Sequence, residues 1–94
     1  MIVQALHIKE DGTINQIVPK NGADFSLEEL QGYVDGKIEI VDLRNGDILV
    51  VNEEGKFTKG MNCFATFVGH STKSLFTNDY IAGNVVMCPS EMVK

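Results

Sequence analysis

Short stretches of the chain alternate apolar and polar residues with a period of two, and turn-forming residues separate them. This pattern, with its many Val and Ile residues, predicts β-strands. The expected strands cover residues 2–9, 14–18, 38–43, 48–51 and 81–87. Residues 48–51 are apolar on both faces, which is typical of a strand inside a sheet.

Tight turns connect these strands. Residues 10–13 separate the first two strands, and the pair Asn45 and Gly46 predicts a β-hairpin with a type I′ turn, because both central residues of that turn need φ > 0. Residues 54–55 predict another turn, and residues 56–57 a short continuation of the strand.

A helix start is the clearest local signal. Ser26 can accept hydrogen bonds from free N–H groups of the first turn, and Glu29, three residues later, can reach back to the Ser26 N–H. Gly36 has the place of the residue that ends a helix. These residues predict a helix from 27 to about 35.

Residues 62–68 fit two structures. Asn62 can cap a helix that ends at Gly69 and carries Phe64 and Phe67 on one apolar face. The same residues also alternate, although less regularly, as a strand would. The helix is favoured, and residues 69–79 are expected to form a loop.

Together the elements predict the α+β class, with one domain over residues 1–88 and a loose tail over 89–94. A mainly antiparallel sheet of four or five strands carries both helices on one face. The expected core consists of Ile2, Leu6, Ile8, Ile17, Leu27, Leu30, Val34, Ile38, Ile40, Leu49, Val51, Phe64, Phe67, Ile81, Val85 and Met87. A core this thin makes a homodimer plausible.

Composition excludes several classes of protein. The chain has 94 residues, 44% of them hydrophobic, and a net charge of -5. An acidic chain argues against direct binding to nucleic acid or to anionic lipid, and no apolar stretch approaches the ~18 residues of a membrane span. The N-terminus lacks a signal-peptide pattern, and two cysteines, Cys63 and Cys88, fit free thiols in a cytoplasmic protein.

No sequence motif indicates catalysis, a cofactor or a metal site. His7 and His70 are expected to be structural or surface residues, and Lys56, Lys59 and Lys73 form at best a scattered anion-binding patch. Four acidic residues gather around the predicted hairpin, namely Asp42, Asp47, Glu53 and Glu54. A solvated strand end explains them better than a catalytic pair or a cation site does.

Residues 52–66 combine asparagines and glycines at a strand end and a helix start. These residues can satisfy local backbone groups, and the same geometry can expose N–H groups to an anionic ligand.

Three segments together resemble a family of small domains of unknown function from bacteria, phages and mobile elements. They are SLEELQG at 26–32, NEEGK followed by N..AT at 52–66, and D.I.GN at 79–84. The resemblance covers residues 1 to about 88 and implies a small α+β protein. The positions that match the family pattern, and that would form a shared binding surface, are Gln31, Asn52, Glu53, Glu54, Gly55, Asn62 and Thr66.

Two functions follow as hypotheses. The first is a non-catalytic accessory protein of phage or mobile-element type that binds a host protein, or sequesters a small, nucleotide-like anionic ligand. The second is a small metal-assisted hydrolase or nucleotide-processing enzyme that uses Glu53 or Glu54. The missing catalytic motif favours the first.

Overall fold

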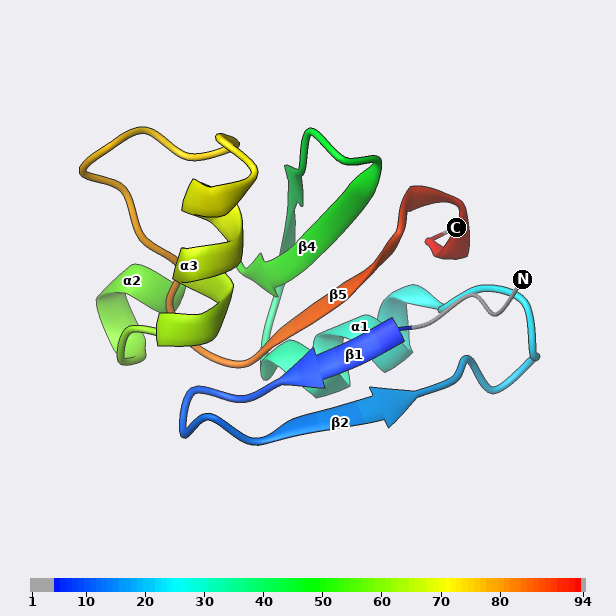
Figure 1. The fold of residues 1–94 in the computed structure, drawn as a ribbon. Helices are drawn as coiled ribbons and strands as arrows, with labels where there is room; N and C mark the ends of the chain where they lie inside the picture. The colour runs from blue at the N-terminus through cyan, green and yellow to red at the C-terminus, as the bar shows by residue number, and fades with distance from the viewer. Residues whose placement is uncertain (1–4, 94) are drawn as a thin grey trace.

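The computed structural model describes residues 5–93, which fold around one antiparallel sheet of five strands (Figure 1). Its strands are β1 (Ala5–Ile8), β2 (Ile14–Ile17), β3 (Ile38–Asp42), β4 (Asp47–Asn52) and β5 (Val85–Pro89). Their order is β2-β1-β5-β4-β3, so that the last strand lies between two hairpins. The predicted α+β class is confirmed, and β4 is an internal strand, as predicted. Strand residues 2–4, including Ile2 of the predicted core, lie outside the described residues.

Both hairpins close with three-residue loops. The N–H of Leu43 donates to the carbonyl of Asp47 at 2.9 Å, which leaves three residues between them. Gly46 has φ 95°, but Asn45 is not among the residues with positive φ, so the predicted type I′ turn is wrong. A glycine at the third loop position is typical of this loop class, and Gly12 (φ 96°) has the same place in the β1–β2 hairpin.

Helix α1 (Leu27–Val34) begins as predicted. The Ser26 hydroxyl accepts from the Glu29 N–H at 3.1 Å, and the Glu29 carboxylate accepts from the Ser26 N–H at 3.0 Å. At the other end Asp35, not Gly36, is left-handed (φ 65°), and the Gly36 N–H donates to the carbonyl of Gln31 at 3.1 Å. Gly36 nevertheless has the predicted place, two residues after the last helical residue Val34, so the predicted helix end near residue 35 is confirmed.

Acid is expected to weaken the start of α1. The pKa of Glu29 lies below its ordinary value because its carboxylate accepts from the N–H of Ser26, and also from that of Lys20. A lowered folded-state pKa stabilises the fold above the unfolded-state pKa, about 4.3, and this contribution is lost as the pH falls through the folded-state value. The difference in urea midpoint between the wild type and Glu29→Gln should therefore shrink on acidification. A difference independent of pH would contradict this account.

The segment after β4 is more helical than predicted. Residues 55–58 form the short helix α2 (Gly55–Thr58) rather than a turn and a strand continuation. Helix α3 (Cys63–Ser71) confirms the favoured helix with its Asn62 cap, but it continues past Gly69. Gly69 is buried inside the helix, where a Cβ atom would lie 2.5 Å from Leu75. This glycine makes room for Leu75 and does not end the helix.

The two longer helices lie on opposite faces of the sheet, and the prediction that both share one face is wrong. Alternate residues of β4 show the division: Val50 packs in the cluster with Leu30 of α1, and Leu49 packs in the cluster with Ala65 of α3. Figure 1 accordingly shows α1 behind the sheet and α3 in front of it. The internal strands are therefore apolar on both sides.

The core prediction holds for most residues of the internal strands and for Leu30 and Val34 of α1, and it fails for the phenylalanines of α3. Buried as predicted are Ile8, Leu30, Val34, Leu49, Val51, Ile81 and Val85, while Leu6, Ile17, Ile38 and Met87 are half-buried. Leu27, Ile40, Phe64 and Phe67 are exposed, and their predicted places in the core are wrong. The small residues Ala65 and Gly69 bring α3 close to the sheet, which turns the two phenylalanines outward.

The chain after β5 is packed, not loose. Residues 90–92 form a 3-10 turn, η1 (Ser90–Met92), and Met92 is buried. The Phe25 N–H donates to the Met92 carbonyl at 2.7 Å, and Phe25 forms a bridge with Val93. The predicted loose tail is therefore wrong for the part of it that the structure describes. Within residues 5–93 no helix is long and apolar enough to span a lipid bilayer.

Candidate functional site

A cavity of about 210 Å³ lies at the β3 edge of the sheet, which we call the edge cavity. The strands β3 and β4, helix α2 and residues 75–82 surround it. Its apolar wall is made by Val41, Val51, Leu75, Ile81 and Ala82. Four of these five belong to the cluster under α3 or pack against it, and the fifth, Ala82, is also buried, so the wall continues the core.

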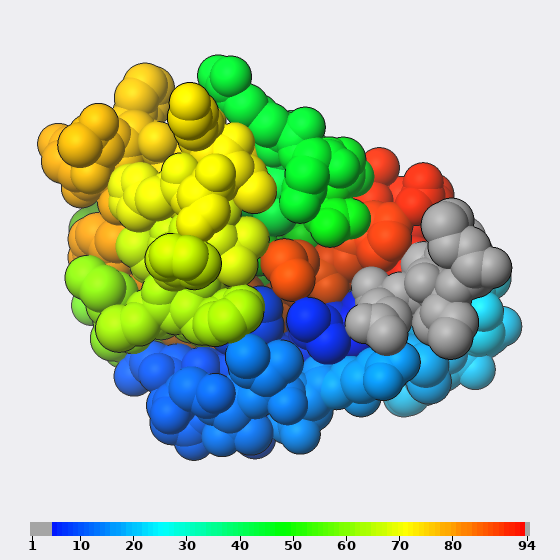
Figure 2. Space-filling view, viewed as in Figure 1, coloured from blue at the N-terminus to red at the C-terminus, as the bar shows by residue number. Residues whose placement is uncertain are grey.

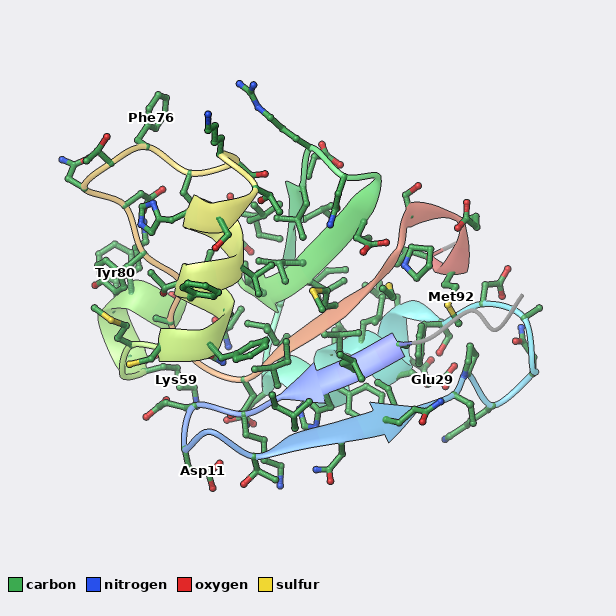
Figure 3. The ribbon with its side chains drawn as sticks, viewed as in Figure 1. Asp11, Glu29, Lys59, Phe76, Tyr80 and Met92 are labelled. Atoms are coloured by element: carbon green, nitrogen blue, oxygen red, sulfur yellow. The ribbon has the colours of Figure 1, made fainter. Side chains whose placement is uncertain are left out.

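Two aromatic side chains border the edge cavity. Tyr80 is half-buried and lies beside α2, while Phe57 of α2 is 88% exposed (Figure 3). Phe76, in the loop before Tyr80, is 83% exposed and points away from the molecule in Figure 3. Large aromatic side chains in water are a feature of binding surfaces.

The charges of the edge cavity are mostly negative. Among the described residues, Glu39, Glu53 and Asp79 line it together with a single cation, Lys56. The Lys56 ammonium forms an ion pair with Asp79 and lies 5.2 Å from the centroid of the Tyr80 ring. This ammonium holds the pKa of Asp79 below its ordinary value, and the Tyr80 N–H, which donates to the same carboxylate, lowers it further. Among residues 5–93, Glu39 and Glu53 form no ion pair.

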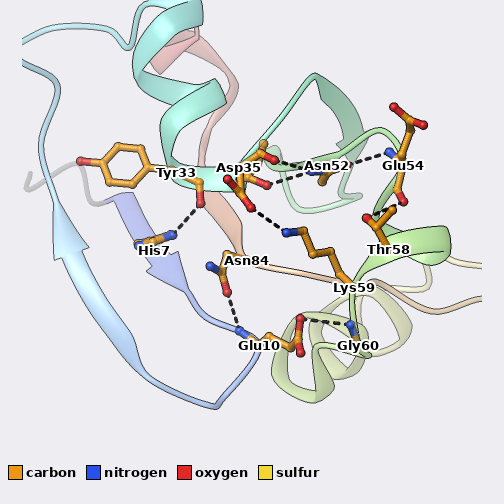
Figure 4. Close-up of polar contacts among 11 residues, drawn as sticks. His7, Glu10, Tyr33, Asp35, Asn52, Glu54, Thr58, Lys59, Gly60 and Asn84 are labelled. Atoms are coloured by element: carbon orange, nitrogen blue, oxygen red, sulfur yellow. Dashed lines mark hydrogen bonds and ion pairs between the residues drawn. The ribbon is translucent and has the colours of Figure 1, made fainter.

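Asn52 lies at the cavity, but its side chain is used for structure. Its amide donates to the carbonyls of Val34 and Asp35 at 3.0 and 3.1 Å, and its oxygen accepts from the Glu54 N–H at 2.8 Å. Figure 4 shows these bonds beside the ion pair between Lys59 and Asp35 (2.6 Å). Asn52 therefore ties the end of α1 to the start of α2 and has no free polar atom directed at a ligand.

Asn62 and Thr66 are also structural. The Asn62 side chain is 1% exposed; it donates to the carbonyls of Ile8 and Gly83 and accepts from the Ala65 N–H. The Thr66 hydroxyl donates to the carbonyl of Ile81 and accepts from its N–H. Both residues fasten α3 to the chain that leads into β5, and neither lines the cavity.

The four remaining positions of the predicted binding surface lie in different parts of the structure. Glu53 lines the edge cavity, and Gly55 is buried against Ala82. Glu54 is exposed and is not part of the cavity wall, and Gln31 belongs to α1 on the opposite face of the sheet. The seven positions thus do not form one surface.

The structure gives little support to the second hypothesis, a metal-assisted enzyme. Within the described residues, no three His, Cys, Asp or Glu side chains lie close enough together to hold a metal ion. The predicted acidic group is divided by the length of β4, with Asp47 at its start and Glu53 just beyond its end. Two of the three lysines that could bind an anion, Lys56 and Lys59, are in ion pairs.

Both histidines have structural contacts, in line with the sequence prediction. His7 Nε2 donates to the carbonyl of Tyr33 at 3.0 Å, and His70 Nε2 donates to that of Asp79 at 2.8 Å. The second bond holds the loop that carries Asp79 and Tyr80 against α3. It therefore helps to position the cavity wall.

Most of the cavity is not predicted by the sequence patterns. Glu39 belongs to an expected strand and Phe57 to an expected strand continuation, while Asp79 and Tyr80 lie at the end of an expected loop. Their one local signal is the presence of aromatic residues in polar segments, such as Tyr80 after an Asn-Asp pair. Their convergence depends on the position of residues 75–82 beside β3, which no local pattern encodes.

The described residues form a small α+β domain with a cavity at the β3 edge of its sheet that carboxylates border. The model of the family described as "Domain of unknown function (DUF3846)" matches residues 3–92. The match covers nearly the whole chain, so the chain belongs to this family, and the resemblance to domains of unknown function is confirmed. No curated protein and no solved structure matches the chain.

Proposed function

We propose that the protein is a non-catalytic binding protein whose edge cavity accepts a basic side chain of a partner protein. The observation that carries the proposal is the combination of an apolar wall, an aromatic ring and a rim of carboxylates. An arginine or lysine side chain has the complementary form, since its alkyl stem packs on apolar surface and its cationic head stays at a polar rim.

The size of the cavity favours a side chain over a nucleotide. Pockets for drug-sized ligands usually enclose about 300–1,000 Å³. The edge cavity, at about 210 Å³, is smaller. It suits a group that a larger partner inserts, and the neighbouring exposed Phe57 and Phe76 would contact the rest of that partner.

The charge of the cavity favours a cation over the small anionic ligand that the sequence also allowed. Three carboxylates face one ammonium there, in a chain whose net charge is -5. The mode of binding has a precedent inside the chain, because Lys56 pairs with Asp79 and lies over the Tyr80 ring. A cation over an aromatic face and next to a carboxylate is stabilised by both. A partner's guanidinium would use Glu39 and Glu53, which form no ion pair with residues 5–93.

The biological setting is part of the proposal. We place the protein among accessory proteins of the phage or mobile-element type, acting in the cytoplasm on a host protein with a basic face. The support is the family resemblance of its sequence segments and its acidic charge. Acidic surfaces speed association with basic partners through long-range attraction.

The test uses N-acetyl-arginine amide and its uncharged counterpart N-acetyl-citrulline amide in NMR titrations of the labelled protein. We expect the arginine compound to shift the amide signals of Tyr80, Glu53 and Ala82. Citrulline should bind more weakly, because it lacks the charge that the carboxylates attract. Equal binding of both compounds, or shifts confined to other regions, would refute the proposal.

Matched variants locate the effect. Glu39→Gln combined with Glu53→Gln should weaken arginine binding by about three- to tenfold, since exposed ion pairs contribute about 0.2–1 kcal/mol each. Glu28→Gln with Glu91→Gln removes the same charge from exposed positions in α1 and η1, outside the edge cavity. This control pair should leave the affinity nearly unchanged. If both pairs weaken binding equally, only net charge matters and the cavity is not the site.

A further inference from the structure

The outward side of α3 is an apolar surface exposed to water. The residues on this side are Met61, Cys63, Phe64, Phe67 and Ser71, which we call the α3 face, and all of them are exposed. Phe67 is 68% exposed and Phe64 41%. Positions 63, 64, 67 and 71 follow helical spacing and so lie on one side of the helix. Figure 2 shows α3, in yellow-green to yellow, standing out on the face in view.

The α3 face is also uncharged. Residues 60–72 contain no Asp, Glu, Lys or Arg, and this is the longest such run in a chain that has 21 of these residues. The next longest run, residues 80–90, leads into β5 and is largely buried. An exposed helix normally carries charged residues on its outer side. Their absence here, with phenylalanines in their place, is typical of an interaction surface.

We propose that the α3 face packs against the α3 face of a second copy of this chain in a two-fold homodimer. In such a dimer the same patch meets itself, so that any charge on the patch would face its own copy. Two copies that each carry a net charge of -5 repel one another, and they can approach most closely through a face without charge. A neutral, apolar face fits a second copy better than it fits a basic partner.

The ends of the α3 face support an antiparallel arrangement. The Glu10 carboxylate accepts from the Gly60 N–H at 3.1 Å, just before α3, and Lys73 follows α3 at its other end. Antiparallel pairing brings Glu10 of each copy toward Lys73 of the other. It also places the oppositely charged ends of the two helix dipoles next to one another.

Sedimentation velocity over protein concentrations from about 1 μM to about 1 mM tests the proposal. This range is needed because one short helix offers less than the ~800 Å² per partner of a standard interface. The wild type should pass from monomer to dimer within it. Phe64→Glu with Phe67→Glu should remain monomeric, because two pairs of carboxylates would meet at the two-fold axis.

A matched control replaces equally exposed apolar residues elsewhere. Val18 and Leu27 are 71% and 56% exposed and lie outside α3. Val18→Glu with Leu27→Glu should dimerise as the wild type does. A wild type that stays monomeric at about 1 mM would overturn the proposal, as would a dimer that survives in the α3 variant or is lost in the control.

Thiol labelling gives a second readout that does not depend on molecular size. Cys63 is exposed on the α3 face, whereas Cys88 is buried and its pKa is raised to about 11, mainly by burial. Only Cys63 should therefore react with a thiol reagent in the folded protein. Its rate constant should fall several-fold as the wild-type protein is concentrated, and should stay constant in the α3 variant. A constant rate in the wild type would contradict the dimer. The edge cavity contains none of these residues, so this proposal and the proposed function can fail separately.

Discussion

Replacing Asn62 with alanine is expected to lower the free energy of unfolding by about 3–5 kcal/mol. The side chain is 1% exposed and makes three hydrogen bonds to backbone groups of three different segments. Alanine leaves the carbonyls of Ile8 and Gly83 and the N–H of Ala65 without these partners. Each buried polar group left unsatisfied costs about 1–3 kcal/mol. The total is a large share of the 5–15 kcal/mol that stabilises a typical domain.

Urea unfolding followed by circular dichroism measures this loss. Asn62→Ser retains an oxygen that can cap α3 but has no amide to reach the carbonyls of Ile8 and Gly83, so its stability should lie between those of wild type and alanine variant. It also provides a measurement if the alanine variant does not fold. Asn78→Ala, at an exposed position, should change stability by less than about 0.5 kcal/mol. A loss below about 1 kcal/mol in Asn62→Ala would show that these bonds are not what holds the segments together.

Much of the fold can be predicted from the sequence because its signals are local. The start of α1 needs only Ser26 and Glu29, three residues apart, and both hydrogen bonds of the capping box form. Alternation indicates the strands, although the last one covers Val85–Pro89 and not residues 81–87. The continuous apolar run of β4 correctly indicates a strand with neighbours on both sides. Such patterns do not show which face of a sheet a helix covers. For that reason the shared face and the burial of Phe64 and Phe67 were predicted wrongly.

The candidate site could be predicted only in part because its contacts are distant in sequence. Lys56 and Asp79 are 23 residues apart, and the apolar wall combines β3 with residues 75–82. Asparagines in loops are ambiguous, since the same amide can bind a ligand or complete a backbone network. In Asn52 and Asn62 every polar atom of the side chain takes part in a hydrogen-bond network with the backbone. Glu53 is the predicted carboxylate that does reach the edge cavity.

The edge cavity and the α3 face differ in their chemistry. One carries carboxylates beside an aromatic ring, and the other is apolar and uncharged. The segment from 52 to 66 contributes to both regions, with Glu53, Lys56 and Phe57 at the edge cavity and Met61, Cys63 and Phe64 on the α3 face. Within the same segment, Asn52 and Asn62 hold α2 and α3 in place through hydrogen bonds to the backbone.

Gly55→Ala is expected to destabilise the protein by about 1–3 kcal/mol and to weaken binding at the edge cavity. A Cβ atom on Gly55 would lie 2.9 Å from the carbonyl oxygen of Ala82, a backbone atom that cannot rotate away. Either α2 or the chain at Ala82 must therefore move, and both form part of the cavity wall.

Gly32→Ala is the matched control, because Gly32 lies within α1 and, apart from its chain neighbours and the surrounding helix backbone, no atom of residues 5–93 lies within 4 Å of the added carbon. There the substitution should stabilise the protein by about 0.5–1 kcal/mol, since alanine is the better helix former. Thermal unfolding of the two variants should show changes in stability of opposite sign. Arginine titration of Gly55→Ala measures the effect on binding at the edge cavity. If Gly55→Ala stabilises the protein as Gly32→Ala does, then α2 is not packed against Ala82 as closely as described, and the wall of the edge cavity is not rigid.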